Sequence, residues 1–152
     1  MLVSDWMVAD PVTVTPETKL FEAQKTMRDG GFRRLPVVSR GRLVGIVTDR
    51  DLREAAPSKA TSLSVFELNY LLSRLSVKDV MKTAVLTVSP DDGIERAALL
   101  MNEHKISGLP VIDGDVVVGI LTITDLLQAF VTMLDLREGG RATPAERGAG
   151  AT

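Results

Sequence analysis

The sequence predicts an α+β fold built from two tandem β-α-β-β-α units that pack as a pseudo-two-fold pair. The first observation is an internal repeat, because residues 3–52 align with residues 77–126 without a gap at a constant offset of 74. Seventeen of these 50 positions are identical, and many of them are Pro, Gly, Thr or Asp. The second observation is that strand-like and helix-like patterns alternate in the same order in both units. The chain is therefore expected to be a duplication.

Each unit is expected to begin with a short extended piece and a helix. Residues 12–14 and 86–88 are rich in Val and Thr, and each is followed by a Thr-Pro or Ser-Pro step that disfavours helix. Apolar residues at helical spacing follow, from residue 20 to a Gly-Gly pair in the first unit and over about 94–103 in the second. Asp91 and Asp92 are expected to cap the second of these helices.

A β-hairpin and a further helix complete each unit. The four strands are expected over residues 34–38, 43–47, 109–112 and 116–121. The turn Asp113-Gly114-Asp115 between β-branched runs is a strong hairpin signal. Its two acidic residues also resemble a metal-binding pair, but a plain turn is the favoured interpretation. The helix that follows the hairpin is expected to start at Thr48 in one unit and at Thr122 in the other.

The remaining segments connect and follow the two units. Ser64 and Glu67 form a capping-box pattern ahead of an amphipathic helix with Leu68, Leu71, Leu72 and Leu75 at helical spacing. The Gly-rich tail carries almost no apolar residues and is expected to be flexible. The predicted division is repeat one at 1–56, a linker with this helix at 57–76, repeat two with an extended last helix at 77–137, and the tail at 138–152.

Composition excludes several classes of function. Eighteen Lys and Arg against 20 Asp and Glu give a formal charge of −2, so no basic field is available to hold nucleic acid. The chain has no Cys and one His, which excludes thiol chemistry and a His-rich metal site. Neither a signal peptide nor an apolar run long enough for a membrane span is visible. A cytoplasmic protein that binds neither nucleic acid nor membrane is expected.

The strand-to-helix junctions carry a Thr-x-x-Asp pattern in both units, Thr48 to Asp51 and Thr122 to Asp125. A Thr hydroxyl and the free N–H groups of a helix start can hold a phosphate, and the carboxylate can accept hydrogen bonds from the diol of a ribose. The same pattern is also a helix cap that binds nothing, and the two roles can coexist. Spacing alone leaves both interpretations open.

The repeated unit, with Leu-Pro-Val, a hairpin and then Gly-Ile-x-Thr-x-x-Asp-Leu, resembles the CBS domain, and two such units resemble a CBS pair or Bateman module. The linker helix makes the chain most similar to the acetoin-utilisation type of CBS protein. The resemblance implies a regulatory, non-catalytic module that binds AMP, ADP, ATP or S-adenosylmethionine between its repeats. The family's ligand motif is complete at residues 119–125, whereas Arg50 replaces its second hydroxyl residue in repeat one.

The motif and its flanking strands define the candidate ligand-binding residues. Ser107 and Gly108 are expected to permit close approach of an adenine or to form a turn. Four basic residues just before these strands are expected either to point at phosphates or to be solvated surface charges. They are Arg33, Arg34, His104 and Lys105. The full predicted set is Thr13, Arg34, Pro36, Val37, Thr48, Arg50, Asp51, Thr87, Ser107, Gly108, Pro110, Val111, Thr122, Thr124 and Asp125. No catalytic residue, catalytic cofactor or metal ligand is predicted.

Two functions remain in competition. The favoured one is a ligand-sensing module that uses an adenine nucleotide as its regulatory ligand and acts on an unidentified partner protein. The alternative is a ligand-free module for dimerisation or protein interaction. In either case a homodimer is expected, because apolar residues of the last helix, over about 124–136, cover more than the single stripe that packing on its own core requires.

Overall fold

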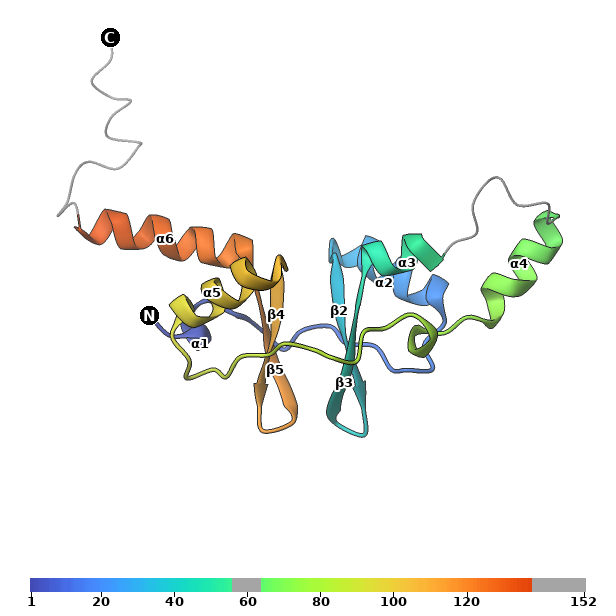
Figure 1. The fold of residues 1–152 in the computed structure, drawn as a ribbon, viewed down its shortest axis with the longest axis horizontal. Coiled ribbons are helices and arrows are strands. Elements are labelled where there is room, and N and C mark those ends of the chain that lie inside the picture. Colours follow the sequence, from blue (N-terminus) through green and yellow to red (C-terminus); the bar gives the residue numbers. More distant parts are fainter. Residues whose placement is uncertain (56–63, 138–152) are drawn as a thin grey trace, which may run out of the picture.

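The computed structural model describes residues 1–55 and 64–137, and these form two β-hairpins with helices around them (Figure 1). The predicted linker turn at 57–62 and the tail at 138–152 lie outside the described residues. The elements in chain order are α1 (Val3–Trp6), β1 (Val8–Ala9), α2 (Leu20–Gly30), β2 (Arg34–Ser39), β3 (Arg42–Thr48), α3 (Asp49–Ala55), α4 (Val65–Arg74), the 3-10 helix η1 (Val77–Asp79), α5 (Ile94–His104), β4 (Gly108–Asp113), β5 (Val116–Thr122) and α6 (Ile123–Arg137).

The repeat seen in the sequence is also a repeat of structure. Strands β2 and β3 pair antiparallel from Arg34 opposite Thr48, and β4 and β5 pair in the same way from Gly108 opposite Thr122. Each hairpin has one register shift, after Val37 and after Val111. Figure 1 shows the two hairpins side by side at the centre, with their turns at one edge and α2, α3, α5 and α6 toward the other. This arrangement confirms the α+β tandem fold.

The first residues of each repeat pack into the core of the other repeat. Val3 of α1 is fully buried in the core of the second repeat, and Val77 of η1 is fully buried in the core of the first. Strand β1 continues this exchange by pairing with β5, while Lys82 bridges to Ile46 of β3. The sequence pattern did not predict this exchange, which ties the two repeats into one structure.

Two hydrophobic cores hold the halves of the molecule. The first contains Leu20, Leu35, Val47 and Leu52, and the second contains Leu109, Leu121 and their neighbours. Trp6 packs against the second core. Each short extended piece pairs with the hairpin of its own repeat through one parallel bridge, Val14 to Val37 and Val88 to Val111.

The ends of the helices follow local chemistry with one exception. Gly31 ends α2 in the left-handed conformation, as the Gly-Gly pair predicts, and Ser64 and Glu67 form the expected capping box at α4. The prediction that Asp91 and Asp92 cap α5 is wrong, because Gly93 is the N-cap and no side chain caps it. The Asp92 carboxylate instead accepts the Ser89 N–H in the preceding turn, at 2.8 Å.

Helix α4 uses a narrower apolar stripe than its sequence predicts. Leu68, Leu72 and Leu75 are partly buried, whereas Leu71 is exposed together with Phe66 and Tyr70. Leu75 packs against the first core, and its carbonyl accepts the N–H of Leu20 at 3.2 Å. The end of α4 is therefore anchored, while no residue of the helix itself is buried.

Gly45 in β3 lies where the exchanged segment crosses the first hairpin, and we expect Gly45→Ala to destabilise the fold. An added Cβ would lie 2.7 Å from the Met81 sulfur and 2.9 Å from the Lys82 carbonyl oxygen. Overpacking of this kind costs about 1–3 kcal/mol, which chemical denaturation would measure. Arg42→Ala in the same strand is the control, with an expected change within about 0.5 kcal/mol. Equal stability of the two variants would contradict the close packing at Gly45.

Candidate ligand-binding clefts

The two Thr-x-x-Asp junctions form where β3 enters α3 and where β5 enters α6. In the first, the Thr48 N–H donates to Asp51 Oδ2 at 2.9 Å, and the Asp51 N–H donates to the Thr48 hydroxyl at 3.1 Å. In the second, the Thr122 N–H donates to Asp125 Oδ2 at 2.8 Å, but the Thr122 hydroxyl donates to the same carboxylate oxygen at 3.0 Å. Both aspartates are therefore helix caps that leave their second oxygen, Oδ1, outside the cap.

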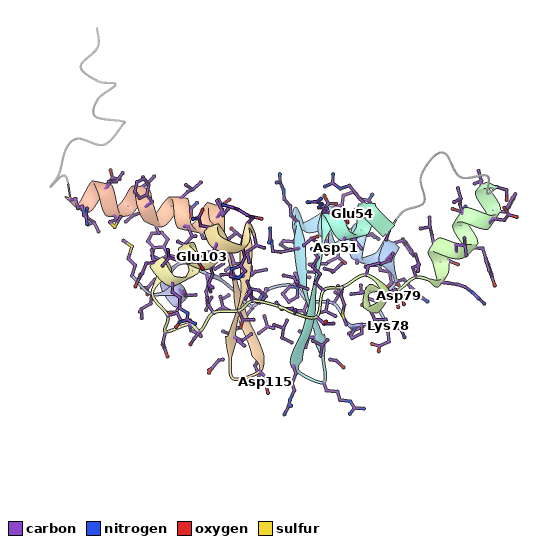
Figure 2. All side chains as sticks on the ribbon, viewed as in Figure 1. Asp51, Glu54, Lys78, Asp79, Glu103 and Asp115 are labelled. Carbon is purple, nitrogen blue, oxygen red and sulfur yellow. The ribbon has the colours of Figure 1, made fainter. Side chains whose placement is uncertain are left out.

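The second oxygen of Asp51 already faces a cation. Lys82 Nζ lies 3.5 Å from Asp51 Oδ1, and Asp51 is 8% exposed. Figure 2 shows Asp51 on α3, at the end of the hairpin strands that is remote from the turns. Asp115 lies at one of those turns. Asp125 is more exposed than Asp51, and no ion pair involves it among residues 1–55 and 64–137. The two carboxylates therefore differ in their electrostatic surroundings.

The first junction borders a cleft between the repeats, called cleft one here. Its outer part has a volume of about 510 Å³ and an adjoining inner part about 120 Å³, and Arg34, Thr48, Lys82 and Ile106 line both parts. The outer part adds mostly charged side chains, and the inner part adds apolar ones. The outer additions are Arg33, Asp49, Arg50, Arg53, Lys105 and Ser107; the inner additions are Ile46, Ala84, Val85, Leu86, Gly108 and Pro110.

The second junction borders an equivalent cleft, called cleft two here, of about 530 Å³. The volumes of cleft two and of the outer part of cleft one both fall within the range of about 300–1,000 Å³ that is usual for small-molecule sites. Thr122 and Thr124 come from the second repeat, and Gly31, Phe32 and Arg33 come from the first. The remaining lining residues are Val8, Arg34, Ser107, Ile120 and Ile123. Each cleft thus combines the junction of one repeat with the helix–strand connection of the other.

Arg34 lies between the clefts and lines both. Its guanidinium donates to the Ser107 hydroxyl and, at 3.5 Å, to the Gly108 carbonyl of the other repeat. Burial of the guanidinium and, to a smaller extent, the positive charge of Arg33 lower the pKa of Arg34. Arg34 nevertheless keeps its positive charge, because an arginine guanidinium is not deprotonated in proteins. Arg34 therefore links the repeats and adds a positive charge to each cleft.

Gly108 permits this close approach of Arg34. A Cβ at position 108 would lie 2.8 Å from Arg34 Nε. The sequence left two roles open for this glycine, close approach of an adenine or a turn. In the structure, it is the Arg34 side chain that approaches Gly108.

Most of the predicted site residues meet at the two clefts. Arg34, Ser107 and Gly108 lie between the junctions, and Pro110 lines the inner part of cleft one. Asp51 and Asp125 lie directly behind the Thr residues that line the clefts.

Other predicted residues do not lie at a cleft surface. The side chains of Val37 and Val111 are fully buried in the two cores, and Pro36 is buried as well. The Pro36 and Pro110 carbonyls accept the N–H groups of Val14 and Val88, so both prolines lie inside the paired region, although Pro110 also lines the inner part of cleft one. Thr13 and Thr87 precede Val14 and Val88, and neither lines the clefts described here. His104 bonds to the Leu100 carbonyl on α5.

Several cleft residues were missed from the sequence, among them Phe32, Arg53, Lys82 and Ile106. Phe32 and Ile106 occupy equivalent positions under the 74-residue offset, so the repeat itself contained a signal for them. Lys82 is equivalent to Val8, and Arg53 to Leu127. Because these two cations are not shared between the repeats, a search for shared residues does not find them.

The described residues 1–55 and 64–137 contain no His, Asp and Glu cluster able to hold a metal ion. Over the same part of the chain, no helix has the length and apolar character needed to cross a membrane.

Comparison with known proteins gives a consistent result. The family model of the CBS domain matches residues 3–58 and 77–132. A Vibrio cholerae protein named for acetoin utilization (AcuB) is 32% identical, with a TM-score of 0.76 over 93% of this chain and 98% of that one. The CBS domain pair of MJ0100, in complex with 5′-methylthioadenosine and S-adenosyl-L-methionine, is 29% identical, with a TM-score of 0.72 over 88% of this chain and 98% of that one.

Two further relatives complete the comparison. CBSX2 in complex with AMP is 30% identical, with a TM-score of 0.71 over 87% of this chain and 97% of that one. The uncharacterised protein MJ1225 of Methanocaldococcus jannaschii is 34% identical over 131 residues. The alignment takes in 85% of this chain but only 47% of MJ1225, so the chain spans about half the length of that relative. With a family match over both repeats and similar CBS folds in solved structures, the chain belongs to the CBS domain family and carries two CBS domains in tandem.

Proposed function

We propose that this CBS pair is a regulatory module that binds adenosine-containing ligands in clefts one and two and transmits their presence to a partner protein. The observation that carries the proposal is that each Thr-x-x-Asp junction borders a cleft completed by the other repeat. A ligand in such a cleft contacts both repeats at once, so its binding can alter how they sit together.

The chemistry of the clefts suits the parts of an adenosine ligand. An aspartate whose Oδ1 lies outside the helix cap can accept hydrogen bonds from a ribose diol, and the Thr hydroxyls add polar contacts beside it. The apolar inner walls around Ile106 and Ile120 suit the faces of an adenine. Two solved relatives were crystallised with ligands that share the adenosine group, MJ0100 with 5′-methylthioadenosine and S-adenosyl-L-methionine, and CBSX2 with AMP. A non-catalytic role agrees with these assignments, since each proposed residue binds and none is assigned a reaction step.

A second candidate function is a ligand-free module for association with a second copy or another protein. Exposed apolar side chains on α4 and α6, among them Phe66, Phe130 and Val131, favour this alternative. The two functions are compatible, because a sensor must also contact the protein that it regulates.

A thermal shift panel over AMP, ADP, ATP, S-adenosylmethionine and NAD separates the candidates. A ligand at 100 times its dissociation constant adds about 2.7 kcal/mol to the free energy of unfolding. For a chain of this size that raises the Tm by roughly 5–11 °C. Inorganic phosphate at the same concentrations is the control for general anion effects. A panel in which no adenosine compound shifts the Tm would favour the ligand-free module.

A further inference from the structure

We propose that the two clefts select different adenosine ligands. Cleft one takes a ligand with a phosphate on its 5′ carbon, and cleft two takes one whose 5′ substituent is uncharged, such as a thioether. The inference rests on the proposed function and concerns which ligand each cleft prefers. It follows from comparing the clefts position by position under the 74-residue offset.

The repeat places charged residues in cleft one where cleft two has uncharged ones. Lys82, Lys105 and Arg50 line cleft one, and their equivalents in cleft two are Val8, Gly31 and Thr124. Asp49 is likewise replaced by Ile123, and Arg53 by Leu127. Each of these five substitutions removes a charge, whereas the Thr and Asp of the junction are retained in both clefts. The repeats have therefore kept the shared part of the site and diverged in charge.

Cleft one has more cations than its own carboxylates neutralise. Six Lys and Arg residues line it, against Asp49 as the one lining carboxylate. Arg50 pairs with Glu54 at 2.9 Å, and Arg53 with Asp49 at 3.4 Å, but these pairs are solvent-exposed. Exposed ion pairs are weak, so a phosphate can replace their acidic partners at small cost. Arg33 and Lys105 form no ion pair among the described residues. The cleft thus has free cations on both repeats, which a phosphate would bridge.

Lys82, which lines both parts of cleft one, reinforces this preference. Its ammonium group lies 3.5 Å from Asp51 Oδ1, the oxygen that a ribose would otherwise use. A ligand that takes over Asp51 releases Lys82, and a phosphate in the same cleft gives the released ammonium a new partner. A ligand without a phosphate leaves it unpaired. Cleft one therefore favours ligands that bring their own negative charge.

Cleft two has the opposite character. Val8, Phe32, Ile120 and Ile123 make much of its wall apolar. Its cations are Arg33 and Arg34, and the Arg34 guanidinium is already engaged with Ser107 and Gly108. A phosphate here would lose its hydration against apolar groups with few donors to replace it, whereas an uncharged substituent would gain burial. In the part of the chain that the structure describes, no lysine pairs with Asp125, so its carboxylate is available to a ribose.

Calorimetry with two probes tests the proposal on the wild-type chain. AMP and 5′-methylthioadenosine are each expected to bind at one site, and saturation with one is expected to leave the affinity for the other within 3-fold. The affinity for AMP is expected to fall at least 10-fold between 50 and 500 mM salt, and that for 5′-methylthioadenosine to change less than 2-fold. Displacement of AMP by 5′-methylthioadenosine from one common site would overturn the proposal.

Exchanging residues between the clefts assigns each probe to its site. The variant Arg50→Thr with Lys105→Gly gives cleft one the residues of cleft two, and Gly fits position 105 because its φ is 54°. This variant is expected to lose at least 10-fold in AMP affinity while 5′-methylthioadenosine binds as before. The matched control is Arg28→Thr with Arg40→Gly, two exposed arginines outside both clefts. Equal weakening of both probes in the cleft variant would overturn the assignment. If neither probe binds the wild type, the proposed function itself fails.

Discussion

Replacing Asp125 by alanine is expected to abolish binding of adenosine in cleft two, with a fall in affinity of at least about 100-fold. A carboxylate that accepts two hydrogen bonds from a ribose diol contributes about 1.5–3 kcal/mol through each bond. The substitution also removes the helix cap on the Thr122 N–H, which costs about 1 kcal/mol of stability. Calorimetry with adenosine measures the first effect, and chemical denaturation measures the second. Loss of the cap is far too small to unfold the chain and imitate a loss of binding.

Asp51→Ala is the matched variant in cleft one, because Asp51 is equivalent to Asp125 under the 74-residue offset. Asp51 caps α3 as Asp125 caps α6, but its second oxygen already pairs with Lys82. A ligand gains less from a carboxylate that it must first release from a lysine, so Asp51→Ala is expected to weaken adenosine binding less. Survival of binding in Asp125→Ala would show that the ribose role is wrong. Equal losses in both variants would show that Arg50 and Lys82 do not distinguish the two clefts.

Sequence patterns predicted the local elements well because each depends on neighbouring residues. The repeat fixed the order of strands and helices, and the Thr-x-x-Asp pattern located both junctions, where a cap and a ligand site need the same residue types. The two hairpins also share one register, as expected from Leu-Pro-Val and Gly-Ile recurring at the same offset in each repeat.

The parts that were missed depend on contacts between distant segments. No local pattern indicates that Val3 and Val77 pack in the core of the other repeat, because a valine is equally suited to burial in either core. The pair of Lys82 with Asp51 forms only after that exchange has brought residue 82 beside β3. Val37 and Val111 were predicted as ligand contacts on account of their place in the motif. Their side chains alternate toward the core, as the pleat of a strand requires.

The apolar surface of α6 leads to the other large expected effect, on assembly. We expect the wild-type chain to be a homodimer and Phe130→Asp with Leu134→Asp to convert it to monomer or to aggregates. Phe130 and Leu134 are 51% and 41% exposed, and Leu127 and Val131 on the same helix are exposed as well. Helix α3, the equivalent of α6, is described over Asp49–Ala55, whereas α6 is described over Ile123–Arg137.

The position of these side chains favours a closed two-fold dimer. Helices α2, α3, α5 and α6 lie toward one edge of the molecule, away from the hairpin turns (Figure 1). Phe21 on α2 and Leu99 on α5 are exposed apolar residues from the same group of helices. An isologous contact over this edge buries apolar residues of both repeats at once and leaves no free copy of the surface to extend a filament. We therefore place α6 in a shared interface and the hairpin turns outside it.

Light scattering at micromolar concentration measures the outcome directly. The wild type is expected to give about twice the chain mass of 16.4 kDa. Two aspartates at positions 130 and 134 put charges where the interface needs apolar contact, and burying them would cost several kcal/mol each. The variant Arg40→Asp is the control, because it places an exposed aspartate at the hairpin turn and should leave the dimer intact. A wild-type mass near that of one chain would contradict a dimer at these concentrations. Loss of the dimer in the hairpin variant alone would move the interface to the opposite edge.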